Sequence, residues 1–238
     1  MKSQVHSVSW GSNVIGFALQ RSDRKRVAIE VNPDLSVVVK APTTARIEPV
    51  LGAVRKKARW ILRQRNYFEQ FLPRTPERVF RSGETHLYLG RRYRLKVHES
   101  ADAPLVKLSG GYIHLWCRNG ASPEARKLIL EAWYAAAIAR LAQVTLSGCL
   151  RHRLLRAIPA PTIAVRKLKK RWASITKKGR LQLNPDVIRA PRRCLEYVLT
   201  HELCHVVVPN HSSQFFKLLT RVMPDWRSRK QDLERTLS

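Results

Sequence analysis

Residues 201–211 read His-Glu-Leu-Cys-His-Val-Val-Val-Pro-Asn-His, and this stretch decides how the C-terminal half of the chain folds. Successive residues of a helix are rotated by about 100°, so the side chains of His201 and His205 fall within about 40° of each other, one turn apart. Two imidazoles placed in this way can bind one metal ion, and Glu202 lies beside them, where its carboxylate can reach a water held by the metal. The pattern H-E-x-x-H therefore predicts a helix that carries a catalytic zinc site.

A third ligand follows after a helix breaker. Pro209 has no N–H for the carbonyl of His205, and it disfavours helical backbone at Val208. The chain must turn there, so His211 can return to the metal instead of pointing away from it. Three histidines and one open position are typical of catalytic zinc, and we expect one Zn²⁺ per chain held by His201, His205 and His211, with Glu202 as the catalytic residue.

The charge of the chain is unusually positive. Among 238 residues there are 45 Lys and Arg against 17 Asp and Glu, a formal net charge of +28, while a hydrophobic content of 44% is that of a folded protein. Such a balance predicts attraction to polyanions, first nucleic acid and second an anionic membrane surface, although some basic enzymes are merely basic.

The positive charge is densest immediately before the expected metal helix, in residues 166–180, where eight of the fifteen are Lys or Arg. The candidates for contact with nucleic acid or substrate are Lys169, Lys170, Arg171, Lys177 and Lys178. Arg171 has three open interpretations: it stabilises a developing oxyanion, contacts phosphate or is simply solvated. A second basic surface is expected on a helix over residues 48–71, where it is either solvated or follows a phosphate backbone.

Cysteine usage and hydropathy indicate the cellular compartment. The four cysteines form no C-x-x-C pair, which is typical of a reducing environment, and we expect Cys204 to be a packing residue off the ligand face. The first twenty residues lack the apolar run of a signal peptide, and no stretch approaches the length of a membrane span. The sequence therefore predicts a cytoplasmic protein.

The order of patterns along the chain predicts an α+β fold. Alternating short strands and turns fill residues 5–41 and 79–117, on either side of the basic helix 48–71. Ser122-Pro123-Glu124 is a helix start, and the helix is expected to run to about residue 155. Three strands over residues 162–183 precede the metal helix 192–207, a helix 214–223 and a short charged tail. We place the domain boundary between a β-rich region 1–119 and a catalytic domain 120–238.

With these motifs in hand, the sequence resembles the YgjP-type metal-dependent hydrolases, which are relatives of SprT-like and other zincin metallopeptidases. The residues that carry the resemblance near the site are 171–174, 179–184, 190–191, 196–205, 210–216 and 223–225. Weaker matches occur upstream, at residues 41–42, 57–61, 82–84 and 89–91. The resemblance implies a zincin-like catalytic domain behind a β-rich N-terminal part, with the same three zinc ligands and with Glu202 as acid and base.

The chain departs from this family in one motif. Trp172-Ala173-Ser174-Ile175 stands where the family usually has Trp-Gly-Ser-Cys, which affects substrate binding more than metal binding. Another type of zincin takes its third ligand from a carboxylate about twenty residues beyond the second His, where this chain has Asp225; we prefer His211 because Pro209 forces the turn.

Three functions are compatible with these residues. We expect a zinc-dependent peptidase acting on proteins or peptides, possible substrates being proteins associated with nucleic acid. The first alternative is a zinc-dependent phosphohydrolase of nucleotides or other phosphate substrates, although no phosphate-binding loop is present. The second is a nucleic-acid-binding module with a structural metal, which Glu202 argues against because a structural site needs no general base.

Overall fold

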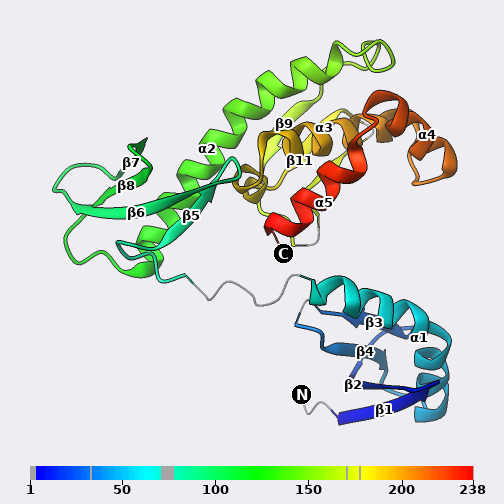
Figure 1. The fold of residues 1–238 in the computed structure, drawn as a ribbon. Helices are drawn as coiled ribbons and strands as arrows, with labels where there is room; N and C mark the ends of the chain where they lie inside the picture. The colour runs from blue at the N-terminus through cyan, green and yellow to red at the C-terminus, as the bar shows by residue number, and fades with distance from the viewer. Residues whose placement is uncertain (1–3, 33, 71–77, 170, 177, 238) are drawn as a thin grey trace. The chain divides into compact units, whose positions relative to one another are not determined.

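The computed structural model describes residues 4–32, 34–70, 78–169, 171–176 and 178–237. It divides the chain into two compact units, residues 1–75 and residues 76–237. Each unit has its own hydrophobic core, and the two cores have no residue in common. The fold is α+β, as predicted, with β-sheet in the N-terminal part and helices later (Figure 1).

The first unit is a four-stranded sheet covered by one helix. Its elements are β1 (Gln4–Trp10), β2 (Asn13–Ser22), β3 (Ala28–Val31), β4 (Val37–Pro42) and α1 (Ile47–Glu69). The strands lie in the order β1-β2-β4-β3, so two antiparallel hairpins are joined by a parallel pairing of β2 with β4. One stripe of α1 is buried against the sheet, and most of its basic residues are exposed.

The second unit begins with a sheet of the same topology. Its strands are β5 (Thr85–Tyr88), β6 (Arg91–Glu99), β7 (Leu105–Ser109) and β8 (Tyr112–Cys117), in the order β5-β6-β8-β7, again with one central parallel pair. Helix α2 (Pro123–Leu150) follows, and it begins as predicted, with the Ser122 hydroxyl accepting a hydrogen bond from the Ala125 N–H. The ββββα arrangement thus occurs twice in the chain, and the amino-acid sequence does not reveal this repetition.

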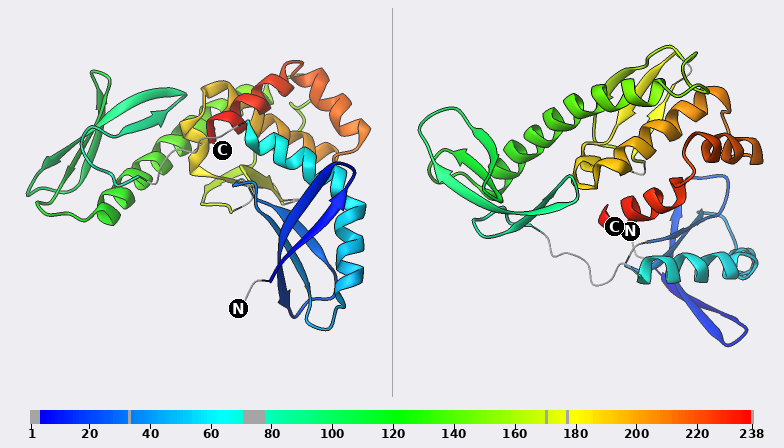
Figure 2. Two further views of the ribbon diagram at one scale, coloured as in Figure 1. Left: turned by 60° about the horizontal axis from the view of Figure 1, so that its bottom comes forward. Right: turned by 45° about the horizontal axis from the view of Figure 1, so that its top comes forward.

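The remaining elements surround the candidate site. They are β9 (Thr162–Val165), β10 (Ala173–Ile175), β11 (Arg180–Leu183), the 3-10 helix η1 (Pro185–Arg189), α3 (Arg192–Val207), α4 (Ser213–Val222) and α5 (Trp226–Leu237). The strands form a small sheet in the order β10-β11-β9, so β10 is an edge strand, and it packs against α3 (Figure 2).

The boundary between the units differs from the one expected at residues 119 and 120. It lies between Thr75 and Pro76, because the inward side chains of β6 and β8 pack with α2 into the core that also holds the metal helix. The loop between β5 and β6 also contacts η1 directly: the N–H groups of Leu89 and Gly90 donate to the carbonyls of Ile188 and Arg189. The second sheet is therefore part of the unit that contains α3.

Gly90 shows how closely this loop approaches the start of α3. Its φ is +79°, and a Cβ at this position would lie 2.7 Å from the Cγ of Pro191, the residue that precedes α3. Only glycine combines that backbone conformation with that approach. Among the described residues, no helix is both long and apolar enough to cross a lipid bilayer.

Candidate metal centre

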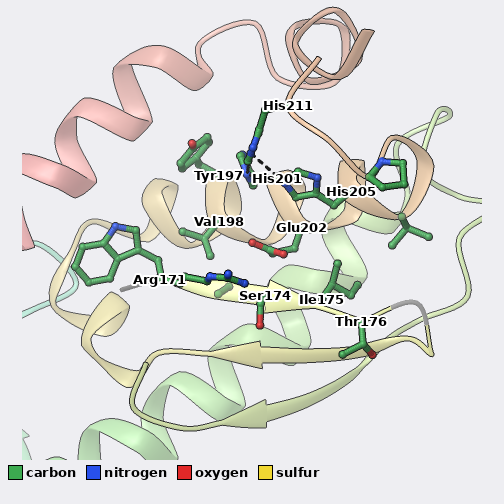
Figure 3. A pocket seen from close by; sticks show the side chains of 14 residues that line it. Arg171, Ser174, Ile175, Thr176, Tyr197, Val198, His201, Glu202, His205 and His211 are labelled. Carbon is green, nitrogen blue, oxygen red and sulfur yellow. Dashed lines mark hydrogen bonds between the residues drawn. The ribbon is translucent and has the colours of Figure 1, made fainter. Parts of the chain in front are cut away.

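Three histidines converge at the C-terminal end of α3. His201 and His205 lie one turn apart on this helix, which ends at Val207, and Val208 is already extended, with φ −129° and ψ 99°. The turn imposed by Pro209 brings His211 back toward the helix (Figure 3). The Nε2 atoms are separated by 3.2 Å for His201 and His205, 3.1 Å for His205 and His211, and 3.0 Å for His211 and His201.

These separations fit a single zinc ion. In a tetrahedral site with Zn–N bonds of about 2.0–2.1 Å, two ligand nitrogens lie about 3.3–3.4 Å apart. Among the residues that the structure describes, this triad is the only group of three or more His, Cys, Asp or Glu side chains placed to hold a metal ion. All three histidines line one cleft, through which water or substrate can reach the site.

The protonation state of the ligands also suits a metal. The Nδ1–H of His205 donates to the carbonyl oxygen of Val208 at 3.2 Å, which leaves Nε2 with a free lone pair. Burial, together with the neighbouring His205 and His211, lowers the pKa of His201 to about 3. Burial also lowers the pKa of His205. Both rings are therefore neutral near pH 7, as ligation requires.

Phe215, which sequence reasoning did not single out, packs against all three histidines. It is fully buried in the first turn of α4, where the Ser212 hydroxyl caps the helix. Its ring centroid lies 4.9 Å from that of His201, 4.4 Å from that of His205 and 4.9 Å from that of His211. The sequence gives two signals: Phe215 lies in the stretch 210–216 that carries the family resemblance, and it is an apolar residue four positions after His211, which any helix could supply.

Glu202 faces the cleft from α3 and is only 8% exposed. The backbone N–H of Ile175 on β10 donates to its carboxylate, and the positive charge of Arg171 also acts on it. Burial raises the pKa of Glu202 to about 7, although this hydrogen bond and the Arg171 charge both act to lower it. Such a carboxyl group is suited to accept and return a proton near neutral pH.

A cleft of about 750 Å³ runs between α3 and the edge strand β10. Its lining includes the three histidines, Glu202, and the backbone and side chains of residues 171–176. In Figure 3 the guanidinium of Arg171 lies on the β10 side, opposite Glu202, whereas the hydroxyl of Ser174 points away from Glu202. Ala173 and Ile175, where the chain departs from the Trp-Gly-Ser-Cys motif, also line the cleft.

The predicted basic residues are only partly brought to this cleft. Arg171 lines it, whereas Lys169 and Lys178 are exposed but do not line it. Lys170 and Lys177 lie outside the described residues. The segment before β10 is held by the buried side chain of Asn184, whose amide donates to the carbonyls of Leu168 and Arg171.

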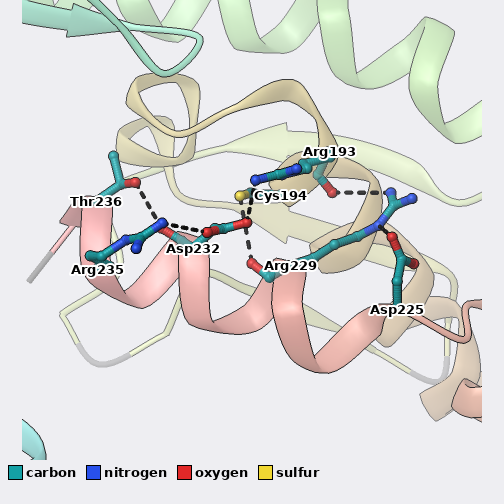
Figure 4. Close-up of polar contacts among 7 residues, drawn as sticks. All are labelled: Arg193, Cys194, Asp225, Arg229, Asp232, Arg235 and Thr236. Carbon is teal, nitrogen blue, oxygen red and sulfur yellow. Dashed lines mark hydrogen bonds and ion pairs between the residues drawn. The ribbon is translucent and has the colours of Figure 1, made fainter.

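Asp225, the alternative third ligand, has a different partner. Its carboxylate accepts a hydrogen bond from Nε of Arg229 at 2.8 Å (Figure 4). The same guanidinium pairs with Glu196 on α3 at 2.6 Å. A further ion pair, at 2.6 Å, joins Asp232 of α5 to Arg193, which is also in α3. These contacts attach α5 to the first turns of the metal helix.

The other histidines and Cys204 contribute to packing or to the surface. His86 is fully buried beside Glu84, and burial lowers its pKa to about 4, while His98 and His114 contact each other on a sheet face. Cys204 is buried within α3.

Tyr197 packs edge-on against His201, with ring centroids 5.7 Å apart, and burial raises the pKa of Tyr197.

Comparison with known proteins gives one match over most of the chain. The model of the family described as "YgjP-like, metallopeptidase domain" matches residues 25–236. No curated protein sequence matches the chain.

Two solved structures are similar over a smaller part. The zymogen of the metallopeptidase abylysin from Pyrococcus abyssi is 26% identical, with a TM-score of 0.34, over 39% of this chain and 88% of that one. The zymogen of the metallopeptidase jannalysin from Methanocaldococcus jannaschii is 21% identical, with a TM-score of 0.36, over 41% of this chain and 90% of that one. The match over residues 25–236 shows that the chain belongs to the YgjP-like family of metallopeptidases.

Proposed function

We propose that the protein is a zinc-dependent peptidase whose metal is held by His201, His205 and His211 and whose general base is Glu202. The observation that carries this proposal is the convergence of three imidazole nitrogens within 3.2 Å of one another beside a buried carboxyl group. Three imidazoles suit zinc better than magnesium or calcium, which prefer oxygen ligands.

When bound, zinc supplies a Lewis acid and lowers the pKa of a water molecule toward neutrality. Glu202 takes a proton from the attacking water and delivers it to the leaving amine. The Ile175 N–H holds the carboxylate toward the cleft, so that the group needs little reorientation between the two transfers. Retention of a general base at this position favours a catalytic over a structural metal.

The edge strand β10 is the proposed site for the substrate backbone. In the part of the chain that the structure describes, its only strand partner is β11, with Ala173 opposite Leu183 and Ile175 opposite Leu181. The Ile175 N–H points away from β11, toward Glu202, so the edge of β10 that is not paired with β11 faces the cleft with the three histidines. A peptide added to this edge would lie extended beneath the histidines, with side-chain pockets alternating along it.

The basic residues around the cleft favour an acidic substrate. Arg171 lines the cleft, and the exposed Lys169 and Lys178 precede and follow β10 in the sequence. They would attract acidic segments of a protein, or a protein associated with nucleic acid, and Arg171 is also placed to stabilise negative charge on the scissile group.

The test combines metal analysis with a substrate screen. We expect about one zinc per chain, loss of zinc in His201→Ala, cleavage of a denatured-protein or peptide library, loss of cleavage on chelation and recovery with zinc. Nucleotides and phosphodiesters are screened in parallel. Turnover of a phosphate substrate without peptide cleavage would replace the peptidase proposal with the phosphohydrolase alternative, and full zinc with no hydrolysis of either class would favour a structural metal.

A further inference from the structure

The outward face of the sheet β5-β6-β8-β7 carries a row of rings and cations. Side chains alternate between the two faces of a strand, and Leu95, Ile113 and Leu115 point inward to the core shared with α2. The alternate positions therefore point outward. They are occupied by Arg92, Arg94, Lys96 and His98 on β6, Tyr112, His114 and Trp116 on β8, and Leu105, Lys107 and Ser109 on β7.

The rings form one continuous group across the two central strands. His98 lies opposite Trp116 in the register, with ring centroids 4.8 Å apart and planes within 18° of each other. His114 lies 5.2 Å from His98, at 16°, and Tyr112 lies 5.9 Å from His114. All four side chains are half-buried, so each keeps part of its ring accessible.

Positive charges surround these rings. The ammonium group of Lys96 lies 4.0 Å from the ring centroid of Tyr112, and that of Lys107 lies 5.9 Å from the ring centroid of Trp116. Lys96, Lys107, Arg92 and Arg94 are all exposed.

The acidic side chains of this sheet lie elsewhere. Glu84 binds His86 and the N–H groups of Val79 and Phe80. Glu99 lies on the same face of β6 as Leu95 and Val97, which is the inward face. Among the described residues, none of the outward positions of β6, β7 and β8 holds a carboxylate. The face is thus positive without local neutralisation.

The first unit supplies an internal comparison. Its sheet has the same strand order and pairing, yet the corresponding outward positions of its two central strands hold Gly16, Ala18 and Gln20 on β2 and Val38 and Lys40 on β4. The arrangement of rings and cations is therefore not a requirement of this topology, and its presence on one sheet alone points to a ligand.

We propose that this face binds single-stranded nucleic acid. Bases stack on aromatic rings irrespective of sequence, while lysine and arginine contact the phosphates, and four-stranded sheets that bind single strands combine these two features. A duplex hides its base faces, so it would use only the charges, and an apolar peptide would gain nothing from four uncompensated cations. The ligand class is a single strand of DNA or RNA, which places a polyanion on the same unit as the proposed peptidase site.

The test measures binding of the full-length protein to labelled twelve-nucleotide oligo(dT) and oligo(U) and to a twelve-base-pair duplex, by fluorescence anisotropy at several salt concentrations. We expect tighter binding to a single strand than to the duplex, and the two single strands distinguish DNA from RNA. Trp116→Ala should weaken single-strand binding by about fivefold to a hundredfold, the loss expected for one stacked base, and Trp116→Phe should restore most of it. Trp10→Ala, which removes an exposed tryptophan from the other sheet, is the matched control and should have no effect.

The charges are tested with two double variants that change charge equally. Lys96→Glu with Lys107→Glu should weaken binding and flatten the salt dependence by about 0.7 per lost phosphate contact. Lys169→Glu with Lys178→Glu, beside the cleft, should have a smaller effect. Circular dichroism and zinc content report whether each variant is folded.

Equal affinity of wild type, Trp116→Ala and Trp116→Phe would overturn the proposal. So would preference for the duplex, or a greater loss in the Lys169 and Lys178 variant than in the Lys96 and Lys107 variant. None of these measurements depends on peptide cleavage, so the outcome is separate from that of the proposed peptidase.

Discussion

At the scale of single residues, the chemistry depends on how Glu202 is held. The side chain is 8% exposed, accepts a hydrogen bond from the Ile175 N–H and lies in the cleft with the three histidines. Without metal, burial raises the pKa of this carboxyl group from 4.5 to about 7. A buried carboxylate of this kind destabilises the fold unless a cation compensates it.

This gives a prediction about pH. Below about pH 4.5 the carboxyl group is protonated in both the folded and the unfolded chain. Between about pH 4.5 and pH 7 it ionises in the unfolded chain but not in the folded chain, so the free energy of unfolding falls as the pH rises. Above about pH 7 the group is ionised in both states and the loss is complete. In zinc-free protein, Glu202→Gln should therefore raise the melting temperature at pH 8 by on the order of several degrees and leave it unchanged at pH 4. Thermal unfolding in a chelator checks this, and an equal shift at both pH values would contradict the raised pKa.

A second prediction at this scale concerns the third ligand. The Nε2 of His211 lies 3.0 Å from that of His201, whereas Asp225 is paired with Arg229. His211→Ala should weaken zinc binding by at least about tenfold, and Asp225→Ala should leave it nearly unchanged. Competition with a zinc-binding dye measures both affinities, and the reverse order would make Asp225 the ligand.

The proposed ligand residues follow from local physics, because the helical spacing of His201 and His205 and the break at Pro209 act within eleven residues. Phe215 could not be found in the same way. Its role depends on how α4 packs across the end of α3, and an apolar residue in an amphipathic helix has no feature that distinguishes a metal site from any other core contact.

At the scale of elements, α4 supports the metal site through that ring. Phe215→Leu keeps an apolar side chain but removes the ring contacts to the three histidines. It should weaken zinc binding by about tenfold, as loss of a contact behind metal ligands commonly does. Leu219→Ala, a buried residue one turn later in the same helix, should destabilise the fold without a comparable loss of zinc affinity. Equal zinc affinities in both variants would show that Phe215 is only a core residue.

The sequence predicts α3 with its observed bounds but misses α5. The metal helix contains an apolar pattern and a clear stop, whereas the segment after Pro224 is charged and reads as a tail. The charged residues of this segment form ion pairs with α3: Arg229 pairs with Glu196 and Asp232 with Arg193. Its apolar residues Trp226 and Leu233 are buried. Tertiary ion pairs of this kind leave no periodic signal in the sequence.

At the scale of the whole molecule, the division between Thr75 and Pro76 was not predictable from turn signals. Asn119-Gly120 is a strong local break, but the sheet before it and α2 after it bury one common core. A loop in the sequence indicates where an element ends and does not indicate which elements pack together.

The two separate cores give a prediction at this scale. A chain that begins at Pro76 should unfold cooperatively and bind zinc with the affinity of the full-length protein, because the metal site and its supporting core lie entirely in the second unit. Calorimetry and zinc competition check this. Loss of cooperative unfolding or of zinc would mean that the first unit is required to form the site.

The central claim is that Glu202 acts on a water beside a metal held by three histidines. The most direct test is the rate of peptide cleavage by wild type and Glu202→Gln, compared at equal and full zinc occupancy. Removal of a general base lowers the rate by about 10²–10⁴-fold, so the variant should retain zinc and lose at least about a hundredfold in turnover. Unchanged turnover in the zinc-loaded variant would contradict the account.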